Sequence, residues 1–215
     1  MGRAVFNLGG VNPFMQLTIY PPLRPALDLA LAISRSGGVV VYPTDTVYGV
    51  GGDATNGAVV QRIIFLKARP TNQPLTVLFS DWAMAQEYVK LDNKLRSNLE
   101  ELTPGPFTFL LPLLKPLPVT SSLLIGCRVP SHEFCQSWAK ALGKPIITTS
   151  ANHHQAPAAR SIEELDEEIA NGVDLIVDGG PSLSGIGSTI IDVTKKKILR
   201  PGAELEKAKA WLTKL

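Results

Sequence analysis

The chain has 215 residues, 45% hydrophobic and 19% charged, with 21 Lys and Arg against 19 Asp and Glu. The apolar content excludes a disordered chain, and a formal charge of only +2 excludes a uniformly basic, nucleic-acid-coating surface. The two cysteines, Cys127 and Cys135, provide neither a disulfide framework nor four zinc ligands. No apolar run approaches the ~20 residues that span a membrane, and the N-terminus lacks the apolar region of a secretory signal. We therefore expect a cytoplasmic protein.

The first half of the chain alternates between helical patterns and short β-branched runs. Residues 1–24 are rich in Gly, Asn and Pro and are expected to form a leader or edge segment before a single domain over residues 25–215. Within that domain the hydrophobic spacing predicts helices over 25–36, 57–67, 81–89 and 93–102. Strands are predicted over 39–42, 75–79 and 107–111.

The second half continues this pattern less regularly. Strands are predicted over 125–129, 146–149, 173–177, 189–193 and 197–199, and helices over 134–142 and about 204–215. Ser161 with Glu164 three residues later resembles a capping box and predicts a helix that begins at Ser161. Because the alternation is irregular and some strands follow each other directly, the predicted fold class is α/β, a single domain with one mixed sheet.

Polar side chains stand where several predicted strands end, which is where α/β sheets expose their ligand sites. Thr44, Asp45 and Thr46 follow the first strand, although an ordinary hydroxyl-stabilised turn explains them equally well. Ser150 and Asn152 follow the 146–149 strand and can bind an anionic oxygen or a base edge, with helix capping as the alternative.

Basic side chains supply the second group of candidates. Pro70 ends the 57–67 helix, and in the extended chain that follows, Lys67 and Arg69 are expected to project the same way as a clamp for phosphate. The alternative is that both merely complement the helix dipole. Arg128 interrupts an apolar strand and must meet a carboxylate, a ligand or solvent, whereas Cys127 on the opposite strand face is expected to fill the core.

Familiar cofactor and metal motifs are absent, including the P-loop, the dinucleotide-binding glycine pattern and H-E-x-x-H. His153 and His154 lack a partner at metal-ligand spacing, so we expect an exposed loop pair and predict no protein metal site. A glycine-rich stretch, Gly185–Ser188, precedes a strand, and Arg200 closes another. A glycine-rich turn alone is weak evidence for phosphate binding.

Taken in order, these segments resemble the YrdC-like family of threonylcarbamoyl-AMP synthases. The resemblance covers roughly residues 25–203 and rests on motifs that follow one another in the family's order, among them Tyr42-Pro43-Thr44-Asp45-Thr46-Val47-Tyr48-Gly49, Lys67-Ala68-Arg69-Pro70, Arg128-Val129-Pro130, Ser150-Ala151-Asn152, Gly187-Ser188-Thr189 and Leu199-Arg200-Pro201-Gly202. It implies an α/β fold of the α+β type, with a twisted mixed sheet, flanking helices and a large, basic-lined concave pocket. It also implies formation of threonylcarbamoyl-AMP and pyrophosphate from L-threonine, bicarbonate and ATP.

The resemblance further implies partners and roles. The product would be passed to downstream tRNA threonylcarbamoyl-transfer proteins that modify the adenosine next to the anticodon, and Mg²⁺ would accompany ATP with few or no protein ligands. The catalytic set would be Lys67, Arg69, Ser150 and Asn152. ATP would be bound by these four residues with Gln73 and Arg200, and threonine by Thr46, Arg128, Thr148 and Ser188.

Three departures from the family pattern fall on Leu78, Leu124 and Ala158, where relatives place a histidine, a threonine and a serine. Backbone or water is expected to replace the missing contacts. One alternative function is a non-catalytic module that binds double-stranded RNA or tRNA, which the low net charge argues against. Another is a paralogue that uses a different amine or acid, which the intact Ser150-x-Asn152 pair argues against.

Overall fold

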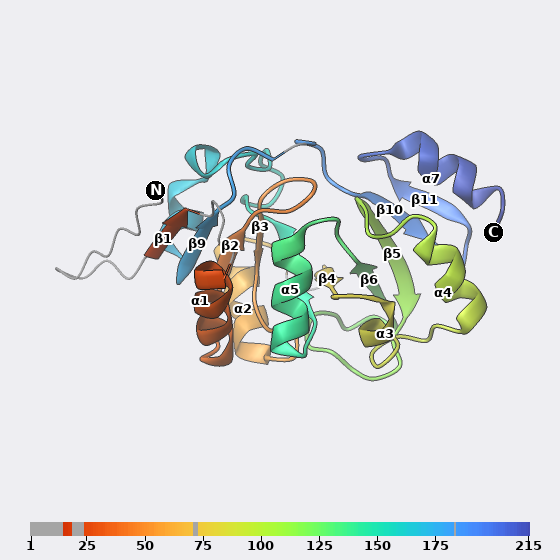
Figure 1. Ribbon diagram of the computed structural model, residues 1–215, viewed down its shortest axis with the longest axis horizontal. Coiled ribbons are helices and arrows are strands. Elements are labelled where there is room, and N and C mark those ends of the chain that lie inside the picture. The colour runs from red at the N-terminus through yellow and green to blue at the C-terminus, as the bar shows by residue number, and fades with distance from the viewer. Residues whose placement is uncertain (1–14, 19–23, 71–72, 183) are drawn as a thin grey trace.

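The computed structural model, which describes residues 15–18, 24–70, 73–182 and 184–215, contains two mixed sheets that lie side by side (Figure 1). The first sheet has the strand order β1-β9-β2-β3-β8, with bounds Met15–Thr18, Leu175–Asp178, Val40–Tyr42, Gly49–Gly51 and Thr149–Ser150. Its pairs β1–β9 and β9–β2 are parallel, and its pairs β2–β3 and β3–β8 are antiparallel.

The second sheet has the order β11-β10-β5-β6-β4-β7, with bounds Lys197–Arg200, Thr189–Asp192, Phe107–Pro112, Leu124–Arg128, Val77–Leu78 and Ile146–Ile147. Strands β7 and β8 are separated only by Thr148, so the chain passes from the second sheet to the first at that residue. This crossing places Thr148 and Ser150 at the junction of the two sheets.

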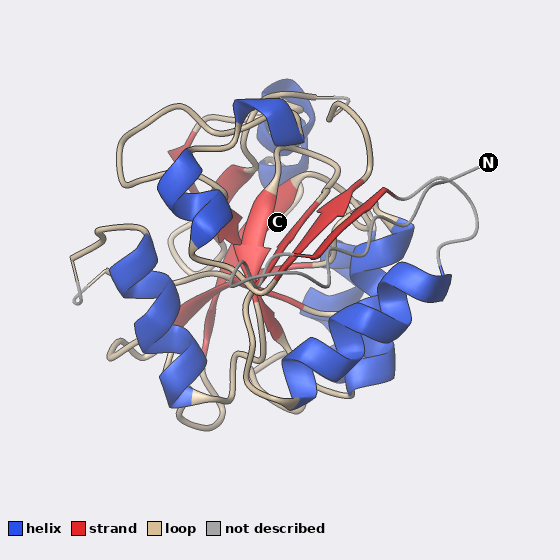
Figure 2. Ribbon diagram, turned by 90° about the vertical axis from the view of Figure 1, so that its left-hand side faces the viewer, coloured by secondary structure: helices blue, strands red, loops and turns tan. Residues whose placement is uncertain are grey.

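Helices cover the outer sides of the sheets, with the strands between them (Figure 2). Their bounds are Arg24–Arg35 (α1), Gly57–Leu66 (α2), Trp82–Ala85 (α3), Asn93–Glu100 (α4), Glu133–Leu142 (α5), Glu167–Asn171 (α6) and Leu205–Leu212 (α7). Helices α1 and α5 share a buried cluster with the first sheet in which the rings of Tyr42 and Trp138 lie 5.1 Å apart. Gly143 ends α5 in the left-handed region (φ 70°), as its position after the helical pattern predicts.

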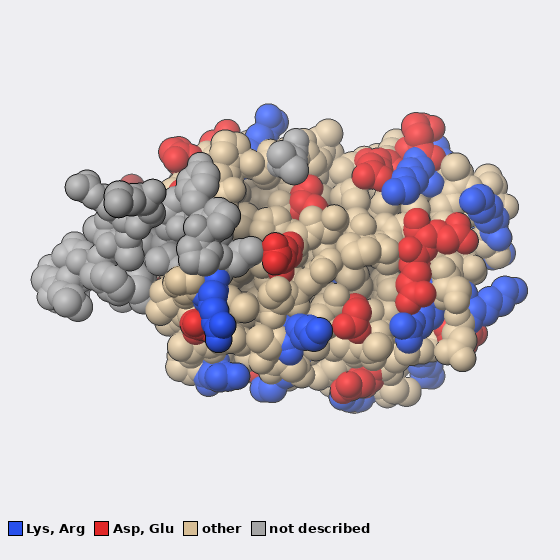
Figure 3. Space-filling view, viewed as in Figure 1, with Lys and Arg blue, Asp and Glu red and all other residues tan. Residues whose placement is uncertain are grey.

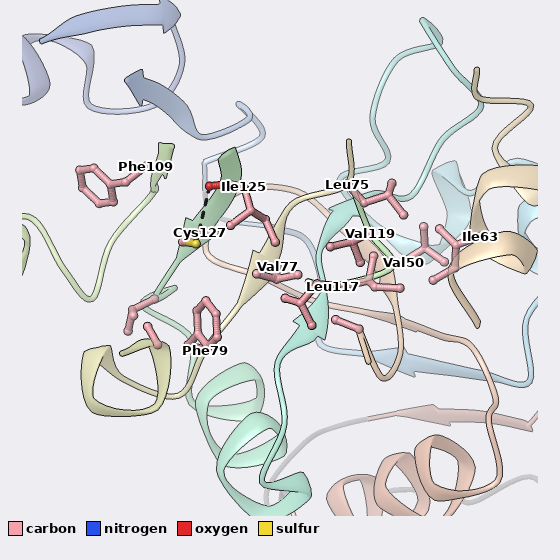
Figure 4. Close-up of a cluster of buried hydrophobic side chains, with 14 of the residues drawn as sticks. Val50, Ile63, Leu75, Val77, Phe79, Phe109, Leu117, Val119, Ile125 and Cys127 are labelled. Atoms are coloured by element: carbon pink, nitrogen blue, oxygen red, sulfur yellow. Dashed lines mark hydrogen bonds between the residues drawn. The ribbon is translucent and has the colours of Figure 1, made fainter. Parts of the chain in front are cut away.

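The larger hydrophobic core joins the sheets to each other and to α2 (Figure 4). Val50 of the first sheet, Val77, Phe109 and Cys127 of the second, and Ile63 of α2 are all fully buried in it. Cys127 therefore fills the core as predicted, and burial raises the pKa of its thiol, which keeps it protonated and unreactive.

The structure confirms the α/β class and most predicted elements. Among the differences, the helix expected over 81–89 covers only Trp82–Ala85, and strand β3 was not predicted. One mixed sheet was expected and two are found. The helix expected from Ser161 is replaced by a 3-10 turn, Ile162–Glu164, followed by α6, whose N-cap is Asp166. Ser161 makes no side-chain cap bond, whereas Asp166 accepts from the amides of two first-turn residues. The carboxylate of Asp166, and not the hydroxyl of Ser161, therefore caps the free backbone amides at the start of the helix.

Residues 1–24 lie largely outside the described part of the chain. Within it, β1 pairs with β9 at the edge of the first sheet, so an edge element is present there. No helix of the described residues is both long enough and apolar enough to cross a lipid bilayer. On the face shown in Figure 3, lysines and arginines are interspersed with aspartates and glutamates, which agrees with the near balance of charge in the sequence.

Candidate active site

A cavity of about 700 Å³ opens where β3 and β8 of the first sheet meet β5, β6, β10 and β11 of the second. This volume lies within the usual range for small-molecule sites. Seven of the ten predicted site residues line it, namely Thr46, Arg69, Thr148, Ser150, Arg128, Ser188 and Arg200. The structure therefore brings together side chains that are scattered over more than a hundred positions of the sequence.

Arg69 enters the cavity because the chain reverses at Ala68. Helix α2 ends at Leu66, and Ala68 takes up the left-handed conformation (φ 47°), while the amide of Arg69 donates to the carbonyl of Ile64 at 3.0 Å. The expectation of an extended chain with Lys67 and Arg69 on one side is wrong for this reason. The turn directs only Arg69 into the cavity, where it donates to the carbonyl of Pro74 at 3.0 Å.

The left-handed conformation of Ala68 gives a direct stability prediction. An alanine Cβ is strained in this region by ~1–2 kcal/mol, and glycine is not, although glycine gains entropy in the unfolded chain. Ala68→Gly is therefore expected to increase the free energy of unfolding by about 0.5–1 kcal/mol, as measured by chemical denaturation.

The matched control is Ala32→Gly, an exposed position inside helix α1. There glycine should destabilise by about 0.5–1 kcal/mol, because it loses more entropy in a helix. A loss of stability in both variants would contradict the role given to the turn at Ala68.

Arg200 enters the cavity from the last strand and is held at its base. Its Nη2 donates to the backbone oxygen of Ser188 at 2.9 Å, and the Ser188 hydroxyl lies 2.8 Å from that of Thr108. Gly202 allows this arrangement, because a Cβ there would collide with the backbone of residues 187–188. Burial and the nearby Arg128 lower the pKa of Arg200, and burial and the nearby Arg200 lower that of Arg69.

Arg128 is buried in β6 and forms an ion pair with Asp45, the structural alternative that its sequence position left open. It also donates to the Thr46 hydroxyl at 3.3 Å, and the other Asp45 oxygen accepts from the Ser131 amide at 2.9 Å. The Nε of Arg128 is buried without a partner, and the residue lines the cavity. The guanidinium of Arg128 thus forms a structural ion pair with Asp45 and still has N–H donors that a ligand could use.

The charge of the cavity wall is positive. Three guanidinium groups line it, and no carboxylate is among the described residues that do. Arg128 is neutralised by Asp45, whereas Arg69 and Arg200 donate only to backbone oxygens and a hydroxyl within the described part of the chain. A ligand that carries at least two negative charges would therefore complement the wall, and hydroxyls of threonine and serine provide further hydrogen bonds.

Three predicted site residues do not line the cavity. Lys67 is 2% exposed, and its ammonium group donates to the backbone oxygens of Ser150 and Asn152. Asn152 uses its own amide nitrogen within the same loop, where it donates to the carbonyls of His153 and Ala156 at 2.7 Å. Gln73 is half-buried, and its backbone N–H donates to the carbonyl of Pro70.

The three departures from the family pattern have different surroundings. Ala158 lines the cavity, so the smaller side chain there enlarges it. Leu78 instead packs in the buried cluster of Phe134 and Trp138, and Leu124, the first residue of β6, is not among the lining residues. Of the three departures, only Ala158 therefore lies where a side chain could contact a ligand in the cavity.

Two contributions to the site were missed from the sequence. Thr76, directly before β4, and Thr108, within β5, line the cavity among residues that are otherwise mostly apolar, and a polar residue at such a position was the available signal. Tyr48 also lines it, and its hydroxyl donates to the carbonyl of Gly180 at 2.7 Å and accepts from the amide of Gly179. Burial, together with the nearby carboxylate of Asp178, raises the pKa of Tyr48 to about 12, so the phenol remains neutral.

His153 has partners that local spacing did not show. Its Nε2 lies 3.1 Å from Asp166 and 3.2 Å from Glu168, both at the start of α6. The histidine pair lies in a loop, as expected, but is half-buried and not exposed, and its acidic neighbours come from a later segment of the chain. One nitrogen of His153 and one carboxylate oxygen each of Asp166 and Glu168 lie within 4.8 Å of one another, and both acidic residues are exposed. A protonated imidazole would pair with both carboxylates.

Comparisons with known proteins agree with this architecture. The sequence profile of the Sua5/YciO/YrdC family, described as "Telomere recombination", matches residues 32–202. Relatives named threonylcarbamoyl-AMP synthase are 31% identical over 191 residues in Pyrococcus abyssi and 34% identical over 195 residues in Mus musculus, each covering 84% of this chain. The crystal structure of Pyrococcus abyssi Sua5 complexed with L-threonine matches 91% of this chain, with a TM-score of 0.82 and 28% identity.

The matches differ in how much of each relative they include. The chain spans 56% of the length of the Pyrococcus abyssi relative, 68% of the Mus musculus relative and 60% of the Pyrococcus abyssi structure. All of them overlap the segments from which the cavity is built, and the profile covers most of the chain. The chain therefore belongs to the Sua5/YciO/YrdC family.

Proposed function

We propose that this chain is a threonylcarbamoyl-AMP synthase, a nucleotidyltransferase that forms threonylcarbamoyl-AMP and pyrophosphate from L-threonine, bicarbonate and ATP. The observation that carries the proposal is the meeting of Arg69, Arg128 and Arg200 with hydroxyl groups in one cavity that has no carboxylate among its described lining residues. The names of the relatives and the L-threonine complex of the Pyrococcus abyssi protein support it.

The chemistry explains why charge neutralisation is the main requirement. The threonine amine attacks bicarbonate and, with loss of water, becomes a carbamate. A carbamate oxygen then attacks the α-phosphorus of ATP, the bond from that phosphorus to the bridging oxygen breaks, and pyrophosphate leaves. Both partners of this second step are anionic, so the wall contributes mainly by positioning them and by offsetting their charge.

The residues divide into two groups in this proposal. Arg69 and Arg200, which lack ion-pair partners within the described residues, would bind the phosphates, and Ser150 would donate to the nucleotide beside them. Arg128 would bind the threonine carboxylate with its remaining donors, and Thr46, Thr148 and Ser188 would surround the amino acid.

Mg²⁺ fits this wall only as part of the nucleotide complex. The described lining residues offer hydroxyls but no carboxylate, so the ion would be held by phosphate oxygens and water, as Mg²⁺ often is. When bound, it would reduce the repulsion between the phosphates and the incoming carbamate. We propose no direct side-chain ligand for it.

The wider context follows from the product. The adenylate would be used by tRNA threonylcarbamoyl-transfer proteins in the cytoplasm, to modify the adenosine next to the anticodon. We propose that residues 25–215 form the catalytic domain, which includes the family match over 32–202 and all described lining residues.

The experiment that tests the proposal measures pyrophosphate release by the purified protein with ATP and Mg²⁺. Release is expected only when threonine and bicarbonate are both present, and mass spectrometry should detect threonylcarbamoyl-AMP. Folded protein that releases no pyrophosphate with all substrates present would falsify the assignment. If the chain instead only bound RNA, affinity for RNA would fall steeply with ionic strength, and no threonine-dependent turnover would be seen.

A further inference from the structure

The ammonium group of Lys67 is saturated by the loop that follows β8. Its Nζ donates to the backbone oxygens of Ser150 and Asn152, the latter at 2.5 Å, and lies 3.5 Å from Oδ1 of Asn152. An ammonium group has three N–H donors, and three acceptors surround this one. No donor of Lys67 is left for a phosphate oxygen while these contacts last.

The main chain of Lys67 holds the same loop. Its carbonyl accepts from the amide of His154 at 2.9 Å, so side chain and backbone together contact residues 150, 152 and 154. From the other side, the amide of Ala151 donates to the carbonyl of Tyr48 at 2.8 Å. The segment Ser150–Ala156 is thereby fixed between α2 and β3.

The fixed segment is part of the cavity wall, and Lys67 is not. Ser150 lines the cavity, whereas Lys67 lies behind it with 2% of its surface exposed. Burial and the neighbouring Arg69 lower the pKa of Lys67 to about 7. The two carbonyl oxygens that it contacts act in the opposite direction, because they favour the charged form. The reversal at Ala68 gives the two basic residues different surroundings: Arg69 faces the ligand and Lys67 faces the loop.

We infer that Lys67 is a positioning residue, which holds the Ser150–Ala156 segment in place as the wall of the nucleotide site and does not itself bind the nucleotide. The identity of the occupant rests on the proposed function, but the ordering of the segment does not. In place of the expected clamp of two basic residues, Arg69 binds phosphate and Lys67 acts through Ser150.

The test compares Lys67→Met with Arg69→Met, which removes the same charge two residues away. Amide hydrogen exchange is measured over residues 150–156, with strand β6 (Leu124–Arg128) as an internal reference for global opening. Lys67→Met is expected to speed exchange of the segment relative to β6 by about tenfold or more, and Arg69→Met to leave it within about twofold.

Steady-state kinetics supply the second readout. Lys67→Met is expected to lower kcat about tenfold or more and to raise KM for ATP clearly less than Arg69→Met does, because it loosens the Ser150 contact without removing a phosphate ligand. If Lys67→Met folds poorly, Lys67→Gln, which keeps an amide group with two N–H donors, should give an intermediate exchange rate.

Unchanged exchange of the segment in the Lys67 variants would overturn the inference, and so would a rise in KM for ATP equal to that of Arg69→Met. If the wild-type protein shows no threonine-dependent turnover, the proposed function fails. The exchange experiment then still decides whether Lys67 orders the segment.

Discussion

Alanine in place of Arg69 or Arg200 is expected to raise KM for ATP roughly 10- to 100-fold. Each guanidinium can make charge-assisted hydrogen bonds of ~1.5–3 kcal/mol with a phosphate oxygen, and ~1.4 kcal/mol corresponds to a factor of ten. Neither side chain has a carboxylate partner within the described residues, so its charge is free for the ligand. Steady-state kinetics with ATP as the varied substrate measure the effect.

The matched control for charge is Arg96→Ala, because Arg96 forms a surface pair with Glu100 and does not line the cavity. Its KM for ATP should stay within about twofold, since exposed pairs contribute little. Arg69→Lys and Arg200→Lys should fall between wild type and alanine, because lysine keeps the charge and loses the planar fork. Alanine variants with wild-type KM for ATP would rule out both arginines as phosphate ligands.

The candidate site was more predictable than the loops that shape it. Arg128 could be singled out because a charged residue inside an apolar strand has to be paired or to face a site, and it does both here. The order of the family motifs then connected Arg128 with Ser150 and Arg200. These residues could be identified because their types and their order along the chain are both present in the sequence.

The direction of Lys67 could not be predicted in the same way. It depends on the left-handed conformation of Ala68, which alanine rarely adopts and which tertiary contacts must impose. Sequence patterns favour glycine at such a position, so the turn left no signal.

The strand pairing was hidden for a different reason. Strand β3 has the sequence Gly49-Val50-Gly51, which has low strand propensity, and β8 has only two residues. Gly51 is required because its backbone packs directly against the carbonyl of Ile147, a contact between segments nearly a hundred residues apart. Division into two sheets is set by such long-range contacts, whereas the local alternation of apolar residues reports only that a strand exists.

Removing Asp45 is expected to lower the melting temperature by about 10 °C. The ion pair with Arg128 is buried, with side chains 9% and 7% exposed, and loss of one partner leaves an uncompensated charge. Such losses cost ~3–5 kcal/mol, and each kcal/mol shifts the melting temperature by ~2–4 °C in a chain of this size. Differential scanning calorimetry of Asp45→Ala and Arg128→Ala measures the effect.

The double variant separates this pair from the cavity. Asp45→Ala with Arg128→Ala should be less destabilised than the sum of the single variants, because no buried charge remains without its partner. Arg128→Ala should also raise KM for threonine about tenfold or more, since it removes the proposed carboxylate ligand. Strictly additive changes in stability would show that the two side chains do not interact in solution. An unchanged KM for threonine would confine Arg128 to the structural half of its role, because the remaining lining residues would then account for amino-acid binding without it.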